Sequence, residues 1–93
     1  MAVTIRKKDP EKTPHTTLEL LVESKDQTEL TTAETRAKVL AYARGCGFNA
    51  GGLNSLPSPY PIDEDGKCDD DLVLGKRSIK CWQAEYVVQM GIR

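Results

Sequence analysis

The residues with the most chemical potential are six carboxylates crowded into positions 63–71, which read Asp-Glu-Asp-Gly-Lys-Cys-Asp-Asp-Asp. Hard cations such as Ca²⁺ take oxygen ligands at alternating positions of a loop, with a glycine at the bend. Part of the segment fits such a loop, but Pro61 and Leu72 stand where the first ligand and the final bidentate Glu are needed. The pattern therefore does not predict an EF-hand site, and a metal-dependent module is kept only as an alternative.

Three interpretations of the acidic segment remain. It is a solvated, self-repelling loop, a mimic of phosphate groups in a nucleic-acid-binding groove, or a patch that steers and docks a basic protein. We adopt the last as the working hypothesis, and we expect the aromatic ring at position 60, between two prolines, to add an exposed contact. The expected partner-binding residues are Tyr60, Asp63, Glu64, Asp65, Asp69, Asp70 and Asp71.

Cysteine and histidine offer a second, weaker possibility. Cys46, Cys68, Cys81 and His15 make a formal Cys₃His set, but structural zinc sites take ligands in close pairs and none of these residues are paired. Three cysteines cannot complete a disulfide framework, and no signal pattern opens the chain, so we expect free thiols in the cytoplasm. Cys46 and Cys81 are expected to be buried and Cys68 to lie in a loop, with neither metal nor cofactor bound.

The sequence does not predict an enzyme. The single histidine, His15, follows a proline in a polar stretch, where a catalytic base would be poorly positioned. The chain contains no P-loop, no dinucleotide-binding fingerprint and no nucleophile elbow.

A nucleic-acid-binding module is the main alternative. Sheets that combine exposed aromatic rings with basic neighbours stack single-stranded bases. The formal net charge of −1 and the pI near 5.8 argue against this function. In so small a domain, Trp82 and Tyr86 are expected in the core. The residues that would contact nucleic acid are Lys76, Arg77, Lys80 and Trp82.

One helix is predicted at about residues 32–44. Thr31 and Glu34 match a capping box, and Gly45 and Gly47 supply a stop. At 100° per residue, the expected buried face has Val39 at its edge, with Glu34, Thr35, Lys38 and Tyr42 opposite. That expected buried face consists of Ala33, Ala37, Leu40, Ala41 and Ala43.

Period-two alternation of apolar residues predicts strands at residues 16–24 and 78–90. Shorter strands are expected at residues 3–5 and 48–50, and residues 72–74 are expected to precede a turn at Gly75. Prolines 57, 59 and 61 favour an extended conformation within a long connection.

Together these elements predict a small α+β domain, with one helix packed on an antiparallel sheet and a Gly/Pro-rich acidic loop at 46–71. Residues 1–14 are expected to form a flexible basic arm, and residues 15–93 the domain. No apolar run is long enough to span a bilayer, so no membrane partner is expected. A homodimer is left open, since a small sheet with a long terminal strand offers an exposed edge for pairing with a second copy.

We therefore expect a non-catalytic protein-binding or regulatory accessory module in the cytoplasm. Its size alone suggests comparison with the small inhibitors that phages and mobile elements encode. A protein is the expected partner, and nucleic acid is the alternative.

Overall fold

The structure is a computed structural model that describes residues 3–9, 16–53 and 57–90. Within these residues one main helix packs on a five-stranded antiparallel sheet, which confirms the predicted α+β class. No helix in the described ranges is long and apolar enough to cross a membrane. The elements are β1 (Thr4–Lys7), β2 (Thr17–Ser24), the 3₁₀ helix η1 (Gln27–Thr31), α1 (Ala33–Gly45), β3 (Ala50–Leu53), β4 (Tyr60–Ile62), α2 (Asp70–Val73) and β5 (Cys81–Met90).

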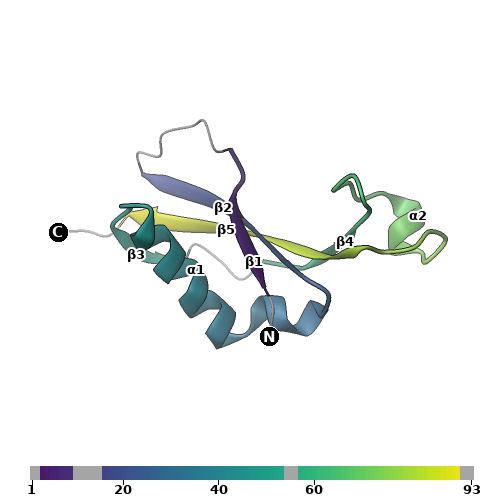
Figure 1. Cartoon of the computed structure of the whole chain (residues 1–93), viewed down its shortest axis with the longest axis horizontal. Coiled ribbons are helices and arrows are strands. Elements are labelled where there is room, and N and C mark those ends of the chain that lie inside the picture. The colour runs from purple at the N-terminus through teal and green to yellow at the C-terminus, as the bar shows by residue number, and fades with distance from the viewer. Residues whose placement is uncertain (1–2, 10–15, 54–56, 91–93) are drawn as a thin grey trace.

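Strand β5 is the centre of the sheet (Figure 1). On one side it pairs with the whole of β2, from Thr17 opposite Gln89 to Ser24 opposite Trp82. On the other side it pairs with β3 near its end and with β4 near its start. The long terminal strand is therefore not an edge, so edge-to-edge pairing with a second copy would have to use β1, β3 or β4.

The two edges of the sheet carry features that oppose pairing with another chain. One edge is β1, which has four residues and includes Arg6 and Lys7. The other consists of β3 and β4, where Gly51 marks a shift in register and Pro61 lacks a backbone donor. The short strand expected at residues 3–5 corresponds to β1 at residues 4–7, and much of the arm expected at residues 1–14 lies outside the described residues.

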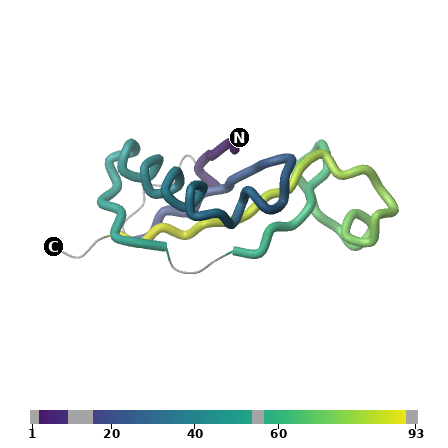
Figure 2. The backbone as a smooth tube through the Cα atoms, turned by 90° about the horizontal axis from the view of Figure 1, so that it is seen from below, coloured from purple at the N-terminus to yellow at the C-terminus, as the bar shows by residue number. Residues whose placement is uncertain are grey.

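Helix α1 covers one face of the sheet (Figure 2). Its buried residues are Thr35, Val39 and Ala43, which recur every four residues. The predicted face was right at Ala43, but Ala33, Ala37 and Ala41 are exposed, and Thr35, expected outside, is buried. Burial of an alanine side chain contributes little free energy, so the alanines do not determine which face of α1 is buried. The Thr35 hydroxyl can be buried because it donates a hydrogen bond to the Glu29 carbonyl at 2.5 Å.

Both ends of α1 have side-chain or backbone caps. The N-cap is Thr32 rather than Thr31, and its hydroxyl oxygen accepts from the Thr35 amide at 3.1 Å. At the other end Gly47 has a φ of 83°, and the Phe48 amide donates back to the Ala43 carbonyl at 3.0 Å. This Schellman motif confirms the predicted glycine stop and brings Phe48 into the core.

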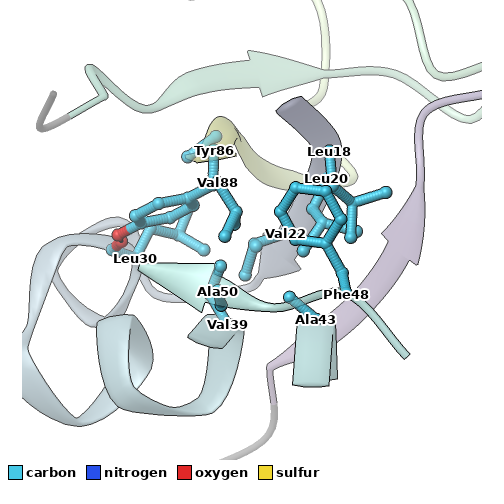
Figure 3. Close-up of a cluster of buried hydrophobic side chains, with 11 residues drawn as sticks. Leu18, Leu20, Val22, Leu30, Val39, Ala43, Phe48, Ala50, Tyr86 and Val88 are labelled. Atoms are coloured by element: carbon cyan, nitrogen blue, oxygen red, sulfur yellow. The ribbon is translucent and has the colours of Figure 1, made fainter. Parts of the chain in front are cut away.

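The main core lies between α1 and the sheet (Figure 3). Tyr86, on β5, is completely buried there, and its hydroxyl donates to the carbonyl of Leu30 in η1. Trp82 is half-buried and packs against the same cluster. The cluster consists of Leu18, Leu20, Val22, Leu30, Val39, Ala43, Phe48, Ala50, Ala84, Tyr86 and Val88.

Two further expectations need correction. Residues 46–71 contain the strands β3 and β4, and β3 begins at Ala50, slightly later than the strand expected at 48–50. Leu72 and Val73, expected only to precede a turn, belong to the single-turn helix α2, which Asp69 caps.

The substitution Tyr86→Phe should lower the free energy of unfolding by about 1–3 kcal/mol, because the Leu30 carbonyl loses its buried donor. Urea unfolding of the variant measures this loss. Tyr42→Phe is the control, since the half-buried Tyr42 hydroxyl makes no hydrogen bond to the described residues. Equal stability of the two variants would show that the Tyr86 hydroxyl contributes nothing.

Candidate functional site: a clamped acidic lobe

The connection between β4 and β5 folds into a lobe that projects from one end of the sheet (Figures 1 and 2). We define the lobe as residues 63–79. Its base is closed by a hydrogen bond from the Lys80 amide to the Ile62 carbonyl at 2.9 Å. The projection makes the chain elongated, with extents of 48 × 27 × 20 Å. The acidic segment is therefore held at the far end of the sheet from most of α1.

Asp63 organises the first turn of the lobe. Its Oδ1 accepts from the backbone amides of Asp65 at 2.9 Å and of Lys67 at 3.0 Å. Gly66, at a φ of 79°, completes this turn in a conformation that favours glycine. The carboxylate thus replaces a backbone acceptor and fixes the course of residues 63–67.

Asp69 organises the second half of the lobe. Its Oδ1 accepts from the Leu72 amide at 3.0 Å and caps α2. The capped turn directs Leu72 inward, where its side chain is 1% exposed and α2 packs on β4. It leaves the next two side chains outside, with Val73 64% and Leu74 68% exposed.

Arg77 joins the two halves. Its Nη2 lies 2.6 Å from Asp69 Oδ2 and 3.3 Å from Asp63 Oδ2, so one guanidinium bridges both organising carboxylates. We call these three residues the clamp. Each carboxylate uses one oxygen for the backbone and the other for Arg77. The clamp therefore couples the turn at residues 63–67 to α2.

The charge states of the clamp follow from these bonds. The Lys67 amide lowers the pKa of Asp63, helped by the Asp65 amide and by Arg77. The Leu72 amide likewise lowers the pKa of Asp69, again helped by Arg77. The carboxylates in turn raise the pKa of Arg77, with Asp69 the larger contributor. All three groups are charged at neutral pH.

The expected partner-binding residues therefore have different roles. Asp63 and Asp69 hold the lobe together, which makes them structural in the first place. Tyr60 lies on β4, half-buried, and its hydroxyl accepts from Gln83 Nε2 at 2.6 Å. Of the expected partner-binding carboxylates, those that are exposed and form no ion pair with other described residues are Glu64, Asp65, Asp70 and Asp71.

The lobe also carries apolar residues that were not among the expected partner-binding residues. Val73, Leu74 and Ile79 are three of the four large hydrophobic side chains that are exposed in the described part of the chain. The fourth, Met90, lies at the end of β5 away from the lobe. Residues 72–74 were expected only to precede a turn at Gly75, so the exposure of Val73 and Leu74 was not predicted.

The residues considered for nucleic-acid contact have separate surroundings. Arg77 belongs to the clamp, and Trp82 packs against the core on the side that α1 covers. Lys76 is exposed on the lobe. Lys80 borders a concavity of about 400 Å³ at the end of β2, whose lining mixes lysines with carboxylates.

The cysteines and carboxylates do not assemble into a metal site within the described residues. No group of three or more potential ligands occurs among them, and His15 lies outside that part of the chain. Cys46 is exposed, contrary to expectation, because it follows the last turn of α1 as its C-cap. Cys81 is buried, as expected, and burial raises the pKa of its thiol. Cys68 is exposed on the lobe.

Comparison of the chain with protein-family models, with curated proteins and with solved structures finds no match.

The clamp makes the order of the lobe depend on pH. In the folded lobe, the pKa values of Asp63 and Asp69 lie below the ordinary value of 3.8. Their ionised carboxylates therefore stabilise the folded lobe above pH 3.8. This stabilisation disappears as the pH falls through the lowered pKa values. Hydrogen-exchange protection factors, which correct for the intrinsic dependence of exchange on pH, should therefore be high for residues 64–76 at pH 6 and fall below pH 3.8, while β2 and β5 stay protected.

Arg77→Gln should accelerate exchange in the lobe already at pH 6, because it removes the bridge between the two carboxylates. Lys76→Gln is the control for lost charge, since Lys76 forms no ion pair with the described residues. Unchanged exchange in Arg77→Gln would refute the structural role of the clamp.

Proposed function

We propose that this chain is a non-catalytic protein-binding module that docks a partner through the lobe. The partner is a protein with a basic surface. The chain would act as a regulatory accessory factor, and its exposed thiols at Cys46 and Cys68 suit a reducing cytoplasm.

The observation that carries the proposal is the coincidence of exposed apolar and acidic groups on one clamped projection. Most of the exposed large hydrophobic side chains of the described residues lie on the lobe, beside four unpaired carboxylates. Apolar side chains gathered at one place on a surface mark interaction sites more often than scattered ones. None of these residues belongs to the main core, which lies between α1 and the sheet.

Rigidity supports the same function. A docking segment that is ordered before it binds loses less conformational entropy on binding. In the lobe, Asp63 and Asp69 fix the backbone through three amides, and Arg77 ties the two turns together. The residues that point outward are therefore presented in one arrangement.

The charge of the lobe defines the partner. Arg77 offsets the clamp carboxylates, so the free charges are four carboxylates and the two lysines Lys67 and Lys76. The excess is negative and lies on a projection accessible from several sides (Figure 1). Such a patch favours encounter with a positively charged surface and disfavours an acidic one.

Neutralising the free carboxylates should abolish partner capture without unfolding the protein. The variant replaces Glu64, Asp65, Asp70 and Asp71 by their amides and keeps the clamp. Tagged protein is used to capture partners from a lysate of the source cells, with and without nuclease treatment, and mass spectrometry compares the bound proteins. We expect a stoichiometric protein that wild type retains and this lobe variant loses.

The matched control neutralises four carboxylates on the sheet and α1, namely Glu19, Glu23, Glu34 and Glu85. It changes the net charge equally and should retain the partner. Equal capture by the lobe variant and wild type would disprove docking through the lobe. Partners that disappear on nuclease treatment would favour the nucleic-acid alternative instead.

A further inference from the structure

We infer that Val73 and Leu74 are the anchor of this interface, and that they fill an apolar pocket edged by lysine or arginine on the partner protein. This inference rests on the proposed function. The inference goes beyond the proposed function in two ways. It assigns binding affinity to two residues outside the acidic segment, and it specifies the chemistry of the partner surface.

The geometry of α2 points to these two side chains. The Asp69 cap and the burial of Leu72 hold the turn against β4, so Val73 and Leu74 are displayed from a backbone that is fixed on its inner side. Both are about two-thirds exposed. Gly75, at a φ of 79°, turns the chain away directly after them, and the Gly75 amide donates to the Leu72 carbonyl at 3.2 Å. The pair therefore stands at a corner of the lobe.

The neighbouring charges define the rim of the complementary pocket. Asp70 and Asp71 immediately precede the buried Leu72 in the same single turn, and both are exposed without a side-chain partner among the described residues. An apolar anchor that carries two carboxylates beside it requires cations around the pocket, since unpaired carboxylates at an interface lose their hydration without compensation. Lys76 lies just after the corner and would repel a cation of the partner there. The basic residues of the partner are therefore expected on the side of the pocket that faces Asp70 and Asp71, and not all around the pocket.

The exposed carboxylates and the apolar anchor should affect different rate constants of binding. Exposed carboxylates at the rim of an interface steer the encounter and change the association rate in a salt-dependent manner. Buried apolar anchors set the dissociation rate, because their desolvation is completed only in the bound state. Carboxylates alone, at the surface, contribute little affinity.

Selection from a displayed library of random peptides tests the inference. The bait is the full chain, and the comparison bait carries Val73→Ser and Leu74→Ser, which touch exposed side chains and should leave the thermal unfolding curve unchanged. On wild type we expect enrichment of peptides that combine lysine or arginine with large apolar residues. Synthetic copies of the enriched peptides should bind the double variant at least about tenfold more weakly than they bind wild type, with most of the change in the dissociation rate.

Met90→Ser is the matched control, because Met90 is another exposed large apolar side chain but lies off the lobe; it should bind like wild type. Enriched peptides that lack apolar residues, no enrichment, or undiminished binding by the double variant would overturn the anchor. If such peptides still lose affinity when Glu64, Asp65, Asp70 and Asp71 are neutralised, the proposed docking through the lobe stands without the anchor. If neither variant weakens them, both proposals fail.

Discussion

Hydrogen bonding along both sides of β5 is the interaction on which the rest of this structure depends. One side aligns β2 over its full length, and the other side receives β3 and β4 at separate places. The same strand carries Ala84, Tyr86 and Val88 into the core, so the sheet and the core are built on one segment. The tyrosine hydroxyl extends this link to η1, which leads directly into α1.

The acidic segment shows how a cluster of like charges can be divided between structure and surface. Two of its carboxylates are placed so that each accepts backbone amides with one oxygen and meets the same guanidinium with the other. These bonds stabilise the ionised form, which offsets the repulsion expected from the sequence. The remaining carboxylates are then free to face solvent. A count of charges along the chain could not have separated the two groups.

Much of the fold was predictable because its main elements have strong local patterns. The alternation in β2 and β5 and the glycine stop after α1 required no knowledge of distant residues. The buried face of α1 was not predictable, because it depends on the carbonyl of Glu29 accepting from Thr35. For the lobe, the acidic composition indicated the region, but Arg77 lies fourteen positions after Asp63, a pairing no local pattern indicates. The same dependence on distant contacts hid the exposure of Val73 and Leu74.

The closed base of the lobe has a consequence for how this protein can change over time. Ile62 and Lys80 are joined by a hydrogen bond at the ends of neighbouring antiparallel strands, so the chain leaves the sheet and returns to it at almost the same point. The length of the connection between them can therefore change without moving the register of β4 on β5. The sheet with α1 would accept a different connection at this point only if that connection also covered β4, as Leu72 does here. Chains with such connections would share a common core and differ in surface.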